Sequence, residues 1–226
     1  MLGLAITGGE GPAPEALREI ALKADVIAAA DSGLIAAEAA GLRPDWVLGD
    51  MDSLGIVSRG SAASLKDGLS LLEKYPPDRV LRYPPDKDFT DTELALALLK
   101  EKGCDEIWLS GGGGGRTDHL FAIRSLFERP LPPDRWFTAN EEIFCLKEGK
   151  TLKGCQALSG LPVSVFPLGD GPWEAESEGL KWPLKGLPWE RGFFGLSNEA
   201  PGGAYEIHSI KGRFLVIVSS SVCRYS

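Results

Sequence analysis

Short apolar runs alternate with amphipathic stretches along the first 140 residues. The apolar and β-branched runs predict strands over residues 2–7, 26–30, 46–48, 79–83 and 106–110. The spacing of apolar positions between them predicts helices over residues 14–24, 34–40, 65–73, 91–102 and 118–127. Strands that take turns with helices form a parallel sheet with helices on its faces. We therefore expect an α/β domain over residues 1–140.

The pattern changes after residue 140. Short strand candidates are separated there by Gly, Pro and Asn, and they cover residues 163–166, 173–176, 180–182, 193–196, 205–210 and 214–218. Lys211-Gly212-Arg213, between the last two candidates, predicts a hairpin turn. This pattern is typical of an antiparallel sandwich or barrel, and we expect a second domain of this kind over residues 141–226.

Composition narrows the range of partners. The chain has 226 residues, of which 43% are hydrophobic, so it can bury a proper core. Its 32 acidic and 24 basic residues give a net charge of −8, which repels nucleic acid and anionic membrane surfaces. We therefore expect small molecules or proteins as partners. If the substrate is a polyphosphate, a divalent cation should lie between it and the carboxylates.

The spacing of the cysteines and the length of the apolar runs indicate in which cellular compartment the protein is expected. The four cysteines have no C-x-x-C spacing, and the two histidines are too far apart in sequence for a zinc motif. The sequence passes directly from Met1 into an apolar strand without a basic leader, and no apolar run approaches the length of a membrane span. We expect a cytoplasmic protein with reduced thiols and no membrane segment.

Four acidic or glycine-rich loops follow predicted strands. In an open parallel sheet, ligands bind at the carboxyl ends of the strands, so such loops are where a site is expected. The loops carry A-D-S-G at 30–33, L-G-D-M-D-S at 48–53, D-K-D-F-T-D at 86–91 and five glycines at 111–115 followed by R-T-D. We take these loops as the candidate site.

Asp50 and Asp52 are the first candidate metal ligands. They stand two residues apart where a strand ends, which directs both carboxylates to the same side. Mg²⁺ prefers carboxylate and phosphate oxygens to nitrogen or sulfur ligands. A turn that uses Asp for local hydrogen bonds is the alternative interpretation of this pair.

The third loop combines acidic residues with a predicted helix start. Asp88 and Asp91 are three apart and could share a face, while Thr90 and Glu93 fit a capping box. Asp91 is explained by the helix dipole about as well as by metal binding. Lys87 either neutralises the neighbouring Asp residues or reaches a phosphate.

The fourth loop predicts phosphate binding. Five consecutive glycines before a helix let backbone N–H groups approach an anion, and Arg116 adds a charged donor. A flexible hinge is the alternative interpretation of the glycine run. His119 lies in the first turn of the following helix, where a local structural role is favoured over a role as a base.

The four motifs in this order closely resemble those of thiamin pyrophosphokinases. G-L-K-W-P-L at 179–184 and L-S-N-E at 196–199 resemble the thiamin-side motifs of that family, so the resemblance covers nearly the whole chain. It implies an α/β fold with an N-terminal parallel-sheet, Rossmann-like catalytic domain and a C-terminal antiparallel β-sandwich. It also implies ATP and thiamin as substrates, a need for Mg²⁺, and a homodimer with active sites at the subunit interface.

The resemblance also assigns individual residues. Asp50, Asp52 and Asp91 are expected to hold the metal, and Asp31 joins them around the diphosphate. Lys87 stands where other members carry Gln. Further contacts to substrates are implied for Asp88, Gly112, Gly113, Gly114, Gly115, Arg116, Ser197 and Asn198. Ser197 and Asn198 are expected at the aminopyrimidine ring, and either Trp182 or Trp189 could stack on the thiamin or pack in the core.

The chemistry implied by the resemblance is attack of the thiamin hydroxyl on the β-phosphorus of ATP, with AMP leaving. Asp91 or Asp50 would take the hydroxyl proton. A diphosphokinase for another hydroxymethyl heterocycle, such as a pterin, is one alternative, and a metal-dependent nucleotide phosphohydrolase is another. A thiamin-binding protein without catalytic activity is the third.

Overall fold

The computed structural model of the protein describes residues 1–51, 71–155 and 160–219. The chain forms two compact units, which we call unit 1 (residues 1–121) and unit 2 (residues 122–226). None of the helices in the described part of the chain has the length and apolar character required to cross a membrane.

Unit 1 is built on a parallel sheet. Its strands are β1 (Leu2–Ile6), β2 (Val26–Ala30), β3 (Trp46–Gly49), β4 (Val80–Arg82) and β5 (Glu106–Ser110). They lie in the order β5-β1-β2-β3-β4, and each neighbouring pair is parallel. The chain leaves β1 toward β2 and reaches β5 on the other side of β1, so the direction of the strand order switches there. A ligand site is expected at the carboxyl ends of strands around such a point.

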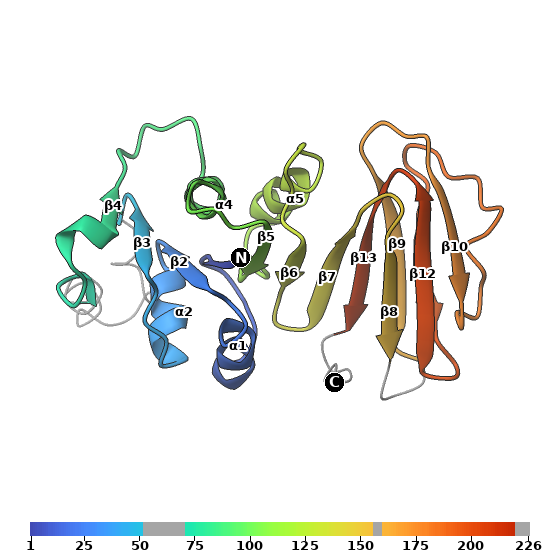
Figure 1. Ribbon diagram of the computed structural model, residues 1–226, viewed down its shortest axis with the longest axis horizontal. Coiled ribbons are helices and arrows are strands. Elements are labelled where there is room, and N and C mark those ends of the chain that lie inside the picture. The colour runs from blue at the N-terminus through green and yellow to red at the C-terminus, as the bar shows by residue number, and fades with distance from the viewer. Residues whose placement is uncertain (52–70, 156–159, 220–226) are drawn as a thin grey trace. The chain divides into compact units, whose positions relative to one another are not determined.

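Helices cover both faces of this sheet. They are α1 (Pro14–Ala21), α2 (Gly33–Ala39) and α4 (Asp91–Glu101). The chain also forms a 3₁₀ turn at Pro77–Arg79 and helix α5 (Thr117–Leu126), in which unit 1 ends. In Figure 1, α4 lies on one side of the sheet and α1 and α2 lie on the other. Leu4, Leu34 and Leu99 are completely buried between these layers. The predicted α/β unit with a parallel sheet is confirmed.

Helix α4 begins where the sequence predicted. Thr90 Oγ1 accepts a hydrogen bond from Glu93 N at 3.3 Å, and Glu93 Oε2 accepts one from Thr90 N at 2.8 Å. This reciprocal pair satisfies two N–H groups that the first turn leaves without partners. The capping box therefore fixes the start of the helix at Asp91.

Unit 2 contains two antiparallel sheets. One has the order β11-β9-β13-β7-β6 and is formed by β6 (Arg135–Phe137), β7 (Glu141–Leu146), β9 (Pro162–Leu168), β11 (Gly195–Glu199) and β13 (Arg213–Ser219). The other has the order β10-β12-β8 and is formed by β8 (Thr151–Cys155), β10 (Glu174–Glu178) and β12 (Ala204–Lys211).

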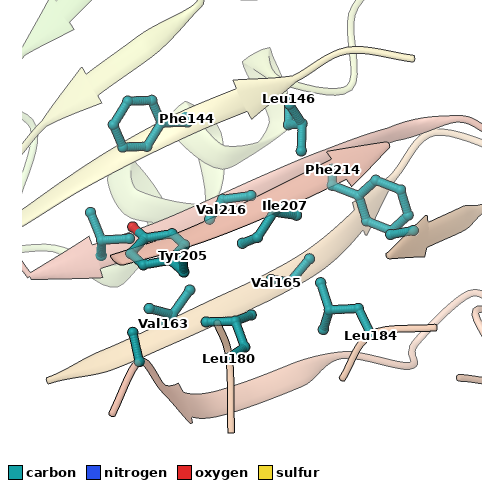
Figure 2. Close-up of a cluster of buried hydrophobic side chains, with 13 residues drawn as sticks. Phe144, Leu146, Val163, Val165, Leu180, Leu184, Tyr205, Ile207, Phe214 and Val216 are labelled. Atoms are coloured by element: carbon teal, nitrogen blue, oxygen red, sulfur yellow. The ribbon is translucent and has the colours of Figure 1, made fainter. Parts of the chain in front are cut away.

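An apolar core joins the two sheets of unit 2. Val165 and Phe214 come from the first sheet, and Tyr205 and Ile207 come from β12 of the second (Figure 2). All four side chains are buried, and each contributes about 1.5 to 3 kcal/mol by leaving water. The side chains of both inner faces share one cluster, which defines a sandwich. The expected antiparallel β-sandwich is confirmed.

Several predictions about strands in the second half were wrong. Residues 180–182 form no strand. Leu180 is buried in the core, and both backbone groups of Trp182 bond to the side-chain amide of Asn198. The turn at 211–213 does not close a hairpin, since β12 and β13 pair with different sheets. Strands β6, β7 and β8 were not predicted from the sequence pattern.

The expected domain limit at residue 140 falls between β6 and β7, which pair antiparallel. The compact units divide earlier, inside α5. The domain limit at residue 140 stays a prediction. The helix expected over residues 65–73 lies mostly outside the described residues.

Candidate metal and substrate site

Three aspartates from separate elements of unit 1 meet at the carboxyl edge of its sheet. Asp31 follows β2, Asp50 follows β3, and Asp91 is the first residue of α4. One carboxylate oxygen of each lies within 4.8 Å of the others. Oxygen ligands of an octahedral Mg²⁺ lie about 3 to about 4 Å apart, so small side-chain movements would bring these three to metal distance.

The chemistry of this acidic cluster, Asp31, Asp50 and Asp91, fits a divalent cation. All three potential ligand atoms are carboxylate oxygens, which Mg²⁺ prefers. Asp91 Oδ1 is buried and has no hydrogen-bond partner among the described residues, although Lys87 Nζ lies 3.0 Å away as an ion pair. A buried carboxylate oxygen without a hydrogen bond is costly unless a cation compensates it.

The carboxylate of Asp31 occupies space that only a glycine leaves open. A Cβ at Gly49 would lie 1.9 Å from Asp31 Oδ1, and the same oxygen accepts a hydrogen bond from Met51 N at 3.3 Å. Gly49 was not singled out in the sequence analysis. The signal was present, since a glycine between a buried strand and an Asp marks a close approach of the backbone.

Left-handed backbone conformations occur in the loops of the acidic cluster of unit 1 and, separately, in the predicted thiamin-side motif of unit 2. Only three residues other than glycine have positive φ in the described ranges, namely Asp31 (46°), Met51 (66°) and Ser197 (57°). Asp31 and Met51 belong to the loops of the acidic cluster, and Ser197 belongs to the predicted thiamin-side motif. Such conformations cost about 1 kcal/mol or more and gather at functional sites.

The acidic cluster changes the proton affinity of Asp31. Burial, a hydrogen bond to Asp91, and the negative charges of Asp91 and Asp50 raise the pKa of Asp31 to about 7, while the hydrogen bond from Met51 N acts in the opposite direction. A cation that binds the ionised carboxylate would therefore compete with a proton near neutral pH.

We predict a pH effect on stability from this shift. In metal-free buffer the free energy of unfolding should fall as the pH rises from about 4 through about 7, because folded Asp31 holds a proton that the unfolded chain has released. Thermal unfolding across this range measures the slope. Asp31→Asn should flatten it and Asp86→Asn, in an exposed position, should not. Equal slopes in Asp31→Asn and the parent protein would contradict this origin.

Lys87 lies inside the acidic cluster. Its Nζ is 3.3 Å from Asp50 Oδ2 and 3.0 Å from Asp91 Oδ1, and its side chain is 12% exposed. Burial by itself would lower the pKa of Lys87, but the contacts with Asp91 and Asp50 outweigh it and raise the pKa. Of the two interpretations of Lys87, neutralisation of the aspartates agrees with this geometry.

The two other predicted acidic site residues, Asp88 and Asp52, are not part of the acidic cluster defined by Asp31, Asp50 and Asp91. Asp88 precedes the start of α4 and is exposed, and the group of carboxylates that could hold a metal among the described residues does not include it. Asp52 lies outside the described residues, so its assignment as a metal ligand stays a prediction.

The glycine-rich loop is bound to the loop after β1. Gly112 N donates to Gly8 O at 2.7 Å, and Gly113 exchanges two backbone hydrogen bonds with Glu10 at 2.7 and 2.8 Å. The N–H groups of Gly112 and Gly113 therefore hold the loop in place in this structure. Gly111 is required by packing, because a Cβ there would lie 2.2 Å from Thr7 O.

The end of this loop, from Gly114 to Arg116, is exposed, whereas its first three glycines are buried. Gly114 and Gly115 have φ values of 61° and 64°. The guanidinium of Arg116 pairs with the carboxylate of Asp118 at 3.1 and 2.5 Å, and both side chains are exposed. The backbone N–H of His119 donates to the same carboxylate, which agrees with a local role for this residue. Nucleotide contacts by Gly112, Gly113, Gly114, Gly115 and Arg116 stay a prediction.

The predicted thiamin-side residues lie in unit 2. Asn198 is buried, accepts a hydrogen bond from Trp182 N at 3.1 Å and donates one to Trp182 O at 2.6 Å, so its amide holds the 179–184 segment against β11. Ser197 is exposed, and Trp182 is 51% exposed. Trp189 is partly buried and packs edge-on against Phe214 of the core at 5.0 Å.

Comparisons with known proteins bear on the family and the fold of the chain. Residues 17–133 match the sequence profile described as "Thiamin pyrophosphokinase, catalytic domain". No curated protein sequence matches the chain. The chain is similar in structure to thiamine pyrophosphokinase from Bacillus subtilis (TM-score 0.73, 22% identity, covering 97% of this chain and 99% of the other). Thiamin pyrophosphokinase from Candida albicans also resembles it (TM-score 0.70, 17% identity, covering 97% and 90%).

The fold and the site together define a class of protein. A parallel-sheet unit joined in one chain to an antiparallel β-sandwich is the fold that this chain shares with the solved thiamin pyrophosphokinases. The profile match covers more than half of the 226 residues. The chain belongs to the thiamin pyrophosphokinase family.

Proposed function

We propose that this protein transfers the diphosphate group of ATP to the hydroxyl group of thiamin, giving thiamin diphosphate and AMP. The observation that carries the proposal is the convergence of Asp31, Asp50 and Asp91 at the carboxyl edge of the sheet, in a chain of the thiamin pyrophosphokinase family. A negatively charged protein needs such a cluster to accept a triphosphate, because a metal held there offsets the repulsion.

We assign Mg²⁺ to the acidic cluster. Asp31, Asp50 and Asp91 would hold it, together with Asp52 as the resemblance implies. When bound, Mg²⁺ neutralises charge on the phosphate oxygens and stabilises the charge that develops during transfer.

The residues of the chain contribute mainly by position and charge. Phosphoryl transfer needs the attacking and leaving oxygens roughly in line, and little covalent chemistry from the protein. The acidic cluster fixes the polyphosphate, and either Asp50 or Asp91 accepts the proton of the thiamin hydroxyl. Gly114, Gly115 and Arg116 are proposed to contact the nucleotide phosphates.

Ser197 and the exposed face of Trp182 are proposed to contact thiamin. We expect Ser197→Ala to weaken thiamin binding by about threefold to tenfold, which corresponds to the loss of one hydrogen bond. The change keeps the Cβ, so the strain of the positive φ at this position is retained. ATP affinity, titrated separately on the same variant, should be unchanged. A parallel loss of ATP affinity, or undiminished thiamin affinity, would contradict the assignment.

We propose that the protein acts in the cytoplasm as a homodimer with active sites at the subunit interface. Light scattering of the purified protein tests the oligomer. A particle of twice the monomer mass supports the proposal, and a fully active monomer contradicts it.

The direct test of function is to incubate the purified protein with ATP, Mg²⁺ and thiamin. Thiamin diphosphate and AMP should form in equal amounts, and neither should form when thiamin is omitted. AMP or phosphate release without thiamin would instead identify a phosphohydrolase. Transfer to a hydroxymethyl pterin but not to thiamin would identify a diphosphokinase with another acceptor.

A further inference from the structure

Lys87 contacts two of the aspartates that are proposed to hold the metal. Its ammonium group lies 3.3 Å from Asp50 Oδ2 and 3.0 Å from Asp91 Oδ1. These aspartates supply two of the three carboxylates that could hold a metal ion. The ammonium therefore occupies the region in which a metal bound to the same carboxylates would lie.

A divalent cation bound to Asp50 Oδ2 and Asp91 Oδ1 would exclude Lys87 from these contacts. A Mg²⁺ ion needs its oxygen ligands at about 2.0 to 2.1 Å, and two positive charges at such close range repel each other. The flexible four-carbon stem of lysine allows the ammonium group to move while the backbone stays in place. Lys87 lies in the loop between β4 and α4, so its side chain starts outside the regular elements.

The contacts of Lys87 with Asp50 and Asp91 are largely buried, so a metal ion has to replace a strong electrostatic attraction. The side chains of Lys87, Asp50 and Asp91 are 12%, 21% and 17% exposed, so water screens their attraction far less than at an open surface. Without a positive charge, Asp50 and Asp91 would face each other and Asp31 with only solvent to offset their repulsion.

We propose that the Lys87 ammonium is a built-in counter-ion of the acidic cluster that competes with the divalent cation for Asp50 and Asp91. Binding of a metal–polyphosphate moves it from these carboxylates to the phosphate oxygens. The competition depends only on the cluster, whereas the second step rests on the proposed function. Lys87 is thus a positioning residue, which keeps the site assembled without metal and lowers its affinity for the free ion.

The competition is tested by titrating metal-free protein with Mn²⁺ in the absence of nucleotide and following free Mn²⁺ by electron paramagnetic resonance. Lys87→Gln should bind Mn²⁺ about tenfold more tightly than the parent protein, because the competing charge is removed. Lys74→Gln is the matched control, since Lys74 pairs with Glu38 at 2.9 Å, outside the cluster. It should bind Mn²⁺ as the parent does. Unchanged or weaker Mn²⁺ binding by Lys87→Gln would overturn the proposal.

The second step has its own measurement. Binding of Mn–ATP to Lys87→Gln should be weaker than to the parent protein, because the ammonium is no longer there to pair with phosphate. If Mn²⁺ and Mn–ATP binding both become tighter by the same factor, the movement to phosphate is wrong. These binding measurements need no turnover, so a failure of the proposed reaction would be seen separately, as a lack of thiamin diphosphate.

The unmodified protein provides a readout should Lys87→Gln fail to fold. The rate at which an amine-reactive acylating reagent modifies Lys87 can be followed by mass spectrometry of the peptides. Saturating Mn²⁺ should increase this rate, because the ammonium leaves its two carboxylates. A rate that Mn²⁺ does not change would contradict the displacement.

Discussion

Asp50→Ala is expected to reduce thiamin diphosphate formation by at least about 1,000-fold, because it removes one of the three carboxylates proposed to hold the metal. The fold should survive. Asp50 shares Lys87 with Asp91, so its removal loses one contact of Lys87 but also relieves repulsion from Asp31 and Asp91, and the thermal midpoint in metal-free buffer should stay close to that of the parent protein. Steady-state kinetics and thermal unfolding of the same preparation measure both effects.

Asp86→Ala is the control for charge. Asp86 is an exposed acid in the loop that carries Lys87, and its removal changes the net charge by the same amount as Asp50→Ala. It should retain turnover within about twofold of the parent protein. Turnover near that of the parent in a folded Asp50→Ala variant would remove Asp50 from the metal assignment.

Gly49→Ala is expected to have the second largest effect. The new Cβ would lie 1.9 Å from Asp31 Oδ1 and 2.7 Å from Asp31 Cγ, so the carboxylate must leave its place in the acidic cluster. The position also has a φ of 143°, which side chains other than glycine rarely adopt. We expect turnover to fall by about 100-fold and the free energy of unfolding by about 1 to 3 kcal/mol.

Gly103→Ala separates these two effects. Gly103 has a φ of 87°, but a Cβ there would meet nothing within 4 Å. This variant should therefore lose stability through backbone strain and keep its turnover. If Gly49→Ala retains full turnover, or if Gly103→Ala loses as much, the displacement of Asp31 is not the cause.

The local pattern of the first half was sufficient to predict its strands. The boundaries of β2 and β5 match the predicted runs, and the capping residue of α4 was identified from Thr90 and Glu93. Each of these features depends on residues close in sequence. Since parallel strands end at one edge, the meeting of Asp31, Asp50 and Asp91 could also be anticipated.

The second half was harder to predict because its pairing depends on distant residues. Lys211-Gly212-Arg213 has the composition of a hairpin turn, yet the chain passes there from one sheet to the other. The segment around Trp182 has a strand-like composition, but only Lys181 N bonds to the backbone of β11 among the hydrogen bonds described, at Glu199 O, while the backbone of Trp182 bonds to the side-chain amide of Asn198. Sequence alone does not reveal which sheet a strand joins.

Sequence could not resolve the details of the site either. It left open whether Lys87 neutralises the aspartates or reaches a phosphate, and the answer depends on distances between loops far apart in the chain. The space that Gly49 leaves for Asp31 depends in the same way on how β2 and β3 align. The hydrogen bonds from Gly112 N and Gly113 N to the loop after β1 could not be read from the sequence, and contacts of these glycines with a substrate stay a prediction.

The central claim is that Asp31, Asp50 and Asp91 together hold the divalent cation. Anomalous diffraction from crystals grown with Mn²⁺ and a non-hydrolysable ATP analogue tests it most directly. We predict one strong peak within about 2.0 to 2.3 Å of a carboxylate oxygen of each of these residues, with phosphate oxygens completing the coordination. A peak elsewhere, with the three carboxylates turned away from the ion and the nucleotide, would contradict the account.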